Sequence, residues 1–117
     1  MAKLEARLYG EFEEVLDALE TAALHGSATA TLEDHSDFRS GGARCAVRVY
    51  ERYSALGSNR VSLQLTLFQA AGDDVLLSAI TSGGSEAMFF KLNTFGEESF
   101  LATLEDVVRA YALENRP

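Results

Sequence analysis

Residues 43–53, ARCAVRVYERY, and residues 61–68, VSLQLTLF, decide the fold, because apolar and polar side chains alternate along both runs. Such alternation predicts half-buried strands, since successive side chains of a strand point to opposite faces of a sheet. The sequence between the two runs, SALGSN at residues 54–59, is typical of a turn. We therefore predict an antiparallel hairpin.

The register of this hairpin follows from matching the apolar faces of its two strands. The match places Val49 opposite Leu63 and Arg48 opposite Gln64, and a shift of one residue would expose every leucine to water. The side chains expected inside are Cys45, Val47 and Val49 on the first strand and Val61, Leu63, Leu65 and Leu67 on the second. The first-strand side chains expected outside are Arg44, Ala46, Arg48, Tyr50 and Arg52.

The same alternation predicts three more strands outside the hairpin. They are expected at residues 3–9, 27–33 and 75–81, with a polar loop over residues 34–42. Residues 86–92, EAMFFKL, have the length and aromatic content of another short strand, with one turn of helix capped by Ser85 as the alternative.

Helical periodicity predicts one helix over residues 11–25 and a second one that closes the chain. The first starts in an acidic turn and is expected to end at Gly26 in a left-handed cap. The pattern from Thr94 to Glu97 predicts a capping box at the start of the second helix. The apolar stripe of the closing helix consists of Phe100, Leu101, Leu104, Val107, Val108 and Tyr111.

These elements predict a single α+β domain over residues 1–117, in the order β-α-β-β-β-(β)-α. Tight turns between strands give an antiparallel sheet of 5–6 strands, so both helices must pack on its one apolar face in a two-layer arrangement. The order is that of TATA-binding-protein-like folds. A Bet v 1-like helix-grip, in which a more curved sheet holds the last helix, is the alternative, and neither likeness implies a function.

Composition excludes several functional classes. The net charge is −8 and the pI about 4.6, so a nucleic-acid partner is disfavoured by repulsion from phosphates. Positive charge is concentrated locally, because residues 39–60 contain five arginines and Glu51 alone among acids. No apolar run has the ~20 residues of a membrane helix, and the N-terminal residues lack the apolar core of a signal peptide. The single cysteine agrees with a cytoplasmic location.

Four segments resemble one protein family. They are CAVRVYERYS at residues 45–54, NRVSL at residues 59–63, SAITSGGS at residues 78–85 and FFKLNTFGEE at residues 89–98. The sequence is similar over nearly its whole length to a family of small bacterial proteins known as domain of unknown function 6054. The resemblance implies a bacterial single-domain protein and assigns no catalytic residue.

Two groups of residues have side chains that could support chemistry. Asp34, His35 and Asp37, with Glu33 and His25 nearby in the sequence, offer metal-ligating atoms. Their spacing matches no known motif, so we expect a solvated acidic loop and neither a metal nor another cofactor. Cys45 lies among apolar neighbours, which is typical of a small core residue and not of a nucleophile. Without a placed nucleophile or base, we do not expect an enzyme.

The arginine row of residues 43–53 is the most informative candidate site. Arg44, Arg48 and Arg52 share a face with Tyr50 and, in the expected register, with Gln64 across the hairpin. One interpretation is an anion-binding or partner-binding face. The other is an ordinary solvent face, on which arginines lie over Tyr50 and pair with nearby acids.

The glycine pair Gly83-Gly84 invites comparison with a phosphate-binding loop. No P-loop lysine follows it, and the next charge, Glu86, repels phosphate. We therefore predict a structural loop in which both glycines take positive φ.

The leading functional hypothesis is a non-enzymatic domain that self-associates, as a homo-oligomer, through the outer face of its sheet. On that face we expect the arginines to be joined by Ala46, Tyr50, Phe68, Leu76 and Ile80. The alternative is a small-molecule binding protein with a cavity between the sheet and the C-terminal helix.

Overall fold

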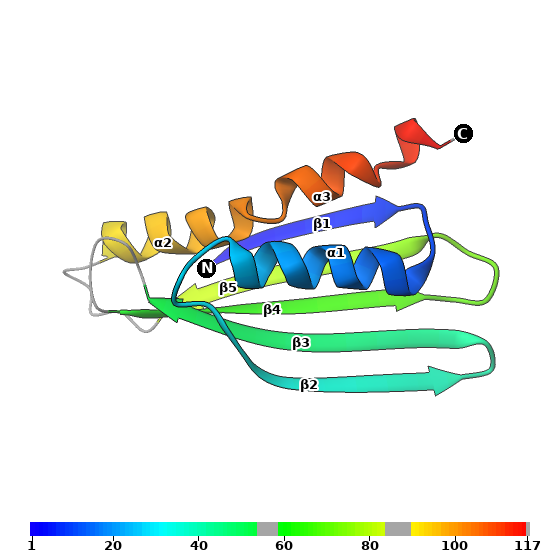
Figure 1. Cartoon of the computed structure of the whole chain (residues 1–117), viewed down its shortest axis with the longest axis horizontal. Coiled ribbons are helices and arrows are strands. Elements are labelled where there is room, and N and C mark those ends of the chain that lie inside the picture. The colour runs from blue at the N-terminus through cyan, green and yellow to red at the C-terminus, as the bar shows by residue number, and fades with distance from the viewer. Residues whose placement is uncertain (54–58, 84–89, 117) are drawn as a thin grey trace.

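The computed structural model describes residues 1–53, 59–83 and 90–116, and only the backbone of residues 90–95. Its strands form one antiparallel sheet in the order β1-β5-β4-β3-β2 (Figure 1). The strands are β1 (Ala2–Leu8), β2 (Thr31–Ser40), β3 (Ala43–Tyr53), β4 (Arg60–Gln69) and β5 (Val75–Gly83). The helices are α1 (Phe12–His25), α2 (Phe90–Ala102), α3 (Glu105–Ala110) and a 3-10 turn at Leu113–Asn115.

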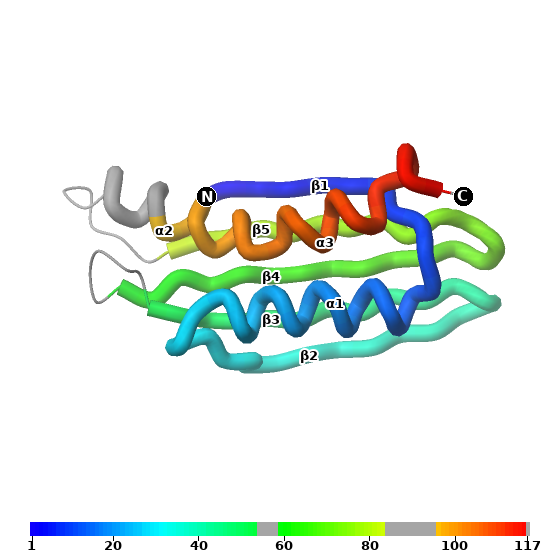
Figure 2. Tube along the Cα trace, turned by 45° about the horizontal axis from the view of Figure 1, so that its top comes forward, coloured from blue at the N-terminus to red at the C-terminus, as the bar shows by residue number. Residues whose placement is uncertain are grey.

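All three α-helices lie on one face of the sheet, which confirms the two-layer α+β prediction. α2 packs against β5, β4 and β1, and α1 contacts α3. In Figure 2, α1 runs along β3 and β4 while α2 and α3 continue one another along the β1 side. The five described strands match the lower of the two expected numbers.

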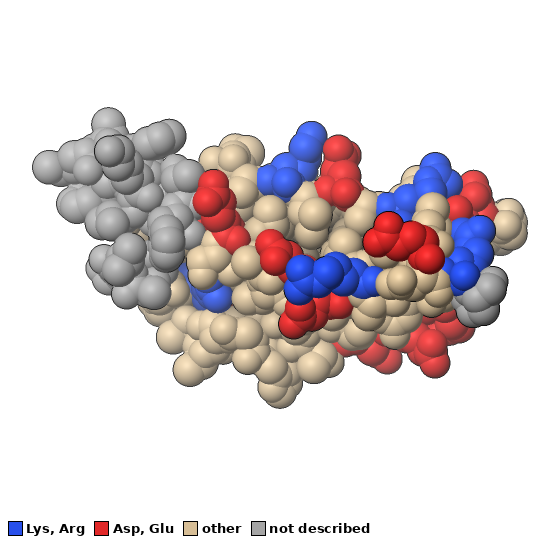
Figure 3. Space-filling model, turned by 90° about the horizontal axis from the view of Figure 1, so that it is seen from above, with Lys and Arg blue, Asp and Glu red and all other residues tan. Residues whose placement is uncertain are grey.

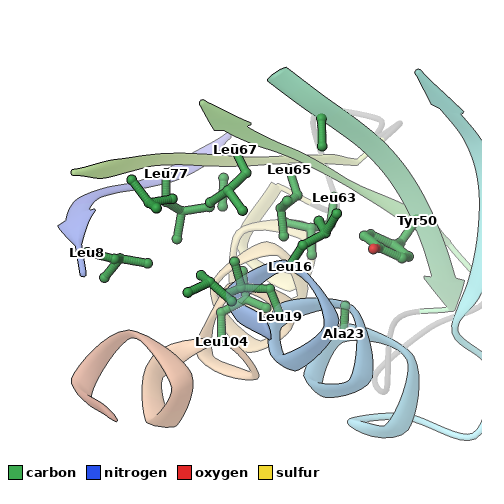
Figure 4. Close-up of a cluster of buried hydrophobic side chains, with 14 of the residues drawn as sticks. Leu8, Leu16, Leu19, Ala23, Tyr50, Leu63, Leu65, Leu67, Leu77 and Leu104 are labelled. Carbon is green, nitrogen blue, oxygen red and sulfur yellow. The ribbon is translucent and has the colours of Figure 1, made fainter. Parts of the chain in front are cut away.

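The core fills the space between the sheet and the helices (Figure 4). The leucines of β4 point to this side, as predicted, and their fully buried side chains meet Leu19 of α1 and Leu104. Burying a leucine contributes about 1.5–3 kcal/mol each, so this layer is the main source of stability. The other fully buried residues of the closing segment and of β5 include Phe100, Val75 and Ala79.

The second strand differs from the prediction. We expected a strand over residues 27–33 and a loop over residues 34–42, but β2 spans Thr31–Ser40. Two features of β2 explain the error: it is an edge strand whose ten residues are all exposed, and its register shifts between Leu32 and Asp34. An exposed edge needs no apolar face, and a bulge interrupts alternation, so period-two hydrophobicity disappears.

The register of the central hairpin is also different from the prediction. Arg48 lies opposite Leu65 and Val49 opposite Gln64, one residue away from the expected pairing. β4 keeps its leucines inside, so the shift turns β3 over. Ala46 and Tyr50 are consequently buried under the helices, while Cys45, Val47 and Val49 lie on the open face.

The closing helix begins earlier than expected and is interrupted. α2 starts at Phe90, so Thr94 lies inside it and the predicted capping box is wrong. The expected strand at residues 86–92 is helical from Phe90 onward, and its first four residues lie outside the described part of the chain. Glu97 is buried, and its Oε2 lies 2.7 Å from the amine of Met1. The predicted apolar stripe of the closing helix is confirmed, with Phe100 and Leu104 fully buried.

Two glycines behave differently from the prediction. Gly83 is the last residue of β5 and pairs with Val61, so the strand extends two residues beyond its predicted end at residue 81. Gly84 lies outside the described residues. Gly26 ends α1 with φ −75°, a right-handed value. A Cβ at Gly26 would lie 2.6 Å from Cγ2 of Thr103, so close packing against the α2–α3 junction requires this glycine.

We predict that Gly26→Ala destabilises the protein by about 1–3 kcal/mol, the usual effect of overpacking. Urea unfolding measures the change. Gly26→Ala combined with Thr103→Ser, which removes Cγ2 and keeps the hydroxyl that donates to the Phe100 carbonyl, should recover part of the loss. Equal stability of Gly26→Ala and the wild type would contradict the contact.

Candidate functional site

The arginine row of β3 faces the helices and not the solvent. Cross-strand neighbours share a face, and the register pairs Arg44 with Gln69, Arg48 with Leu65 and Arg52 with Val61. Arg44 and Arg48 are both partly buried beneath α1. Three cations at the edge of an apolar layer need neutral or negative partners, because burial of an unpaired charge is costly.

The first arginine of the row, Arg44, interacts with two residues at the start of α1. The Arg44 guanidinium lies 4.1 Å from the centroid of the Phe12 ring and forms an ion pair with Glu13. A cation over an aromatic face is attracted by the ring electrons. Arg44 therefore attaches β3 to the first turn of α1.

The second arginine belongs to a denser network with Glu20 and Tyr50. Nε of Arg48 lies 3.6 Å from Oε2 of Glu20, and its Nη2 lies 3.1 Å from Asp37 of β2. The hydroxyl of Tyr50 donates to the same Glu20 oxygen at 2.8 Å. Burial raises the pKa of Tyr50 well above its ordinary value, and the bond to Glu20 raises it further. The phenol therefore stays protonated as a donor.

The third arginine has a different environment. The guanidinium of Arg52 lies 4.4 Å from the centroid of the Phe100 ring, and its Nη2 donates to Oγ of Ser99 at 3.0 Å. Within the described residues, no carboxylate lies within 4.0 Å of it. Burial lowers the pKa of Arg52. It borders a hollow of about 390 Å³ that is lined by Gly26, Ser27, Ala28, Thr29, Tyr53 and Ser99.

Of the remaining candidate residues, Asp37 reaches this row through Arg48, whereas Gln64 and Asp34 lie on the other face of the sheet. Gln64 is exposed on the opposite face of the sheet, paired with Val49 and Ile80. The proposed acidic ligands are divided by strand alternation, because Asp34 pairs with Val49 on the open face while Asp37 pairs with Ala46 under the helix layer. Among the described residues, no group of three or more His, Cys, Asp or Glu side chains could hold a metal ion.

The open face of the sheet carries an apolar stripe that the sequence analysis described only in part. One row crosses four strands through the pairs Phe38–Cys45, Cys45–Phe68 and Phe68–Leu76. Phe38, assigned to a loop from the sequence, is 63% exposed, and Phe68 is 38% exposed. Cys45 is partly exposed here and not a core residue, contrary to the prediction. We define the open-face stripe as Phe38, Cys45, Val47, Val49, Phe68, Leu76 and Ile80.

Charges elsewhere are mixed. On the face that contains the β1 edge, acidic and basic side chains are interspersed and form no broad basic patch (Figure 3). Within the described residues, no helix is long and apolar enough to cross a membrane.

Comparison with known proteins identifies a family. The model of a family of unknown function, DUF6054, matches residues 1–112. No curated protein and no solved structure matches the chain.

We predict that Tyr50→Phe lowers the free energy of unfolding by about 1 kcal/mol at pH 7, the net value of one hydrogen bond. The folded-state pKa of Tyr50 is raised, so its contribution is present below the unfolded-state pKa, near 10, and is lost as the pH rises above that value. Urea unfolding from pH 7 to 11 should therefore show the gap between wild type and variant closing above pH 10.

Tyr53→Phe is the matched control, because Tyr53 lies on the same strand and is largely exposed. Its difference from the wild type should stay within about 0.5 kcal/mol, as for most surface substitutions. A gap for Tyr50→Phe that stays constant over the whole pH range would contradict the raised pKa of Tyr50, which burial and then the bond to Glu20 produce.

Proposed function

The chain belongs to the DUF6054 family, which is described only as a family of unknown function, and from the geometry we propose that it is an interaction domain that self-associates through the open face of its sheet. The observation that carries this proposal is the open-face stripe, which no described helix covers.

Contiguity distinguishes this stripe from ordinary exposed apolar residues. Single exposed apolar side chains are common on soluble proteins, but a continuous patch is typical of an interaction surface. Phe38, Cys45, Phe68 and Leu76 are successive cross-strand neighbours, whose Cβ atoms lie about 5 Å apart. Val47 and Val49 extend the patch along β3.

The area of the face suits a dimer. Strands of 7 to 11 residues, about 4.8 Å apart, give a five-stranded face of about 24 Å by 30 Å, or about 700 Å². Stable interfaces bury about 800 Å² on each partner. Two such faces packed as sheet on sheet therefore supply an interface of ordinary size, in which the same patch is used twice about a two-fold axis.

The mixed charges at the border of the open face are compatible with a second copy of this chain as the partner. The protein has a net charge of −8, so two copies repel one another over most of their surfaces. The open face carries charges of both signs at its borders, with Lys3, Glu5 and Arg7 on β1 and Asp34 and Glu51 toward the β2 edge. A two-fold operation can bring opposite charges together around the apolar centre.

The interacting face differs in composition from the one that the sequence predicts. Ala46, Tyr50 and the three arginines face the helices, and of the predicted set only Phe68, Leu76 and Ile80 lie on the open face. The lost residues are replaced by Phe38, Cys45 and the two valines of β3. We keep a bacterial, cytoplasmic setting as part of the proposal, supported by the family resemblance and by the partly exposed thiol of Cys45.

Ligand binding inside the layer, the alternative from the sequence, has less support. Leu63, Leu65 and Phe100 are fully buried between the sheet and the closing helix, so the hollow of about 340 Å³ that lies there is confined to the β1 side, where Lys3, Leu4, Glu98, Leu101, Ala102 and Glu105 line it. The hollow beside Arg52 lies at the end of that layer.

Sedimentation velocity over a range of concentrations tests self-association. We expect the wild type to form dimers as the concentration rises and Phe68→Glu to remain a monomer, because two buried, unpaired carboxylates oppose the interface. Leu32→Glu is the matched control: Leu32 is also 38% exposed, but it pairs with Tyr50 on the helix side of β2. It should dimerise as the wild type does. A wild type that stays monomeric throughout would end the proposal.

The native Cys45 gives an independent test without a change to the interface. Its thiol lies within the stripe, so dimerisation should slow its modification by a soluble thiol reagent. We expect the modification rate of the wild type to fall as the protein concentration rises, and the rate of Phe68→Glu to stay constant. Concentration-independent rates for both proteins would place the interface elsewhere.

A further inference from the structure

Arg52 interrupts a regular pairing between β3 and α1. Arg44 pairs with Glu13, and Arg48 pairs with Glu20. The arginines recur every four residues along β3 and the glutamates every seven along α1, so the next helix position in the series is residue 27. That position is Ser27, just beyond the end of α1, and Ser27 lines the hollow beside Arg52. The third arginine thus shares a hollow with a serine, where the first two form ion pairs with glutamates.

The guanidinium of Arg52 is held in place, and the described residues use only one of its donors in a side-chain hydrogen bond. Stacking over Phe100 fixes the plane of the group, and one Nη2 bond goes to Ser99. A guanidinium has five N–H donors arranged to match a carboxylate or a phosphate. Its position and orientation are therefore set before any ligand arrives, which lowers the entropic cost of binding.

Hydroxyl groups around the hollow supply further donors. Oγ of Ser99 accepts from Arg52, which leaves its own O–H free to donate. Ser27 and Thr29 share one hydrogen bond of 3.2 Å, so one of their two hydroxyl protons is used and the other is free. Both oxygens already accept backbone N–H groups, from Thr29 at 3.2 Å and from Tyr53 at 3.1 Å, which holds the pair in place.

We propose that Arg52, Ser99 and the Ser27–Thr29 pair form a binding site for a small oxyanion, of the phosphate or carboxylate class. Oxyanions have only acceptor atoms, and the groups that border this hollow offer donors from a cation, from Ser99 and from one hydroxyl of the Ser27–Thr29 pair. The negative end of the α1 dipole lies at the same end of the molecule and weakens binding, so affinity in the millimolar range is expected for a simple ion. This site lies on the helix side and is independent of the open-face stripe.

The test is calorimetric titration of the full chain with inorganic phosphate and, separately, with acetate, at low ionic strength. Saturable binding of either ion supports the site, and the tighter ion identifies its class. Arg52→Gln should weaken that binding by about tenfold or more, as expected for loss of a charge-assisted hydrogen bond. Arg39→Gln is the matched control, because it removes the same charge from exposed β2 and should leave affinity unchanged.

Two further variants keep the result interpretable if Arg52→Gln is unstable. Arg52→Lys retains the charge but lacks the planar fork, and Ser99→Ala removes one hydroxyl; each should weaken binding without loss of fold. The chemical shift of the Arg52 Nε group should follow the titration in the wild type. Absence of saturable binding for both ions, or an equal loss for Arg39→Gln and Arg52→Gln, would overturn the proposal.

Discussion

The pairing of Arg48 with Leu65 in the central hairpin is the constraint on which the rest of this structure depends. It turns the arginine face of β3 toward the helices, where a cation needs compensation. α1 supplies that compensation with Glu13 and Glu20 from one side of the helix. The position of α1 on the sheet and the register of the hairpin therefore depend on each other, through both ion pairing and packing.

The length of the arginine side chains allows Arg44 and Arg48 to lie beside the apolar layer. Arg44 and Arg48 can cover apolar neighbours with their methylene stems while their charged heads reach acids near the rim of the layer. Tyr50 does the same at the centre, with its ring in the core and its hydroxyl on Glu20 (Figure 4). The result is a layer whose middle is leucine-rich and whose β3 border is polar, with charged or hydrogen-bonding partners for Arg44, Arg48 and Tyr50.

The same register also determines what the other face presents. When β3 turns its arginines inward, Cys45, Val47 and Val49 must point outward, next to Phe68 and Phe38 of the flanking strands. The register of β3 against β4 thus produces both the open-face stripe and the inner arginine row. A protein with the opposite register would have had a basic outer face and an apolar, fully covered β3.

The sequence by itself determined the α+β class, the antiparallel sheet, the inward faces of β1, β4 and β5, and the apolar stripes of both helical segments. Periodicity sufficed there because those elements have one clearly apolar side. It could not identify β2, whose exposed edge has no apolar side, nor the interruption between α2 and α3. Only the tertiary structure decided which face of β3 lies inside. Alternation defines two faces without assigning either to the core, and the choice rests on acids of α1, about thirty residues away in the chain, that make buried arginines stable.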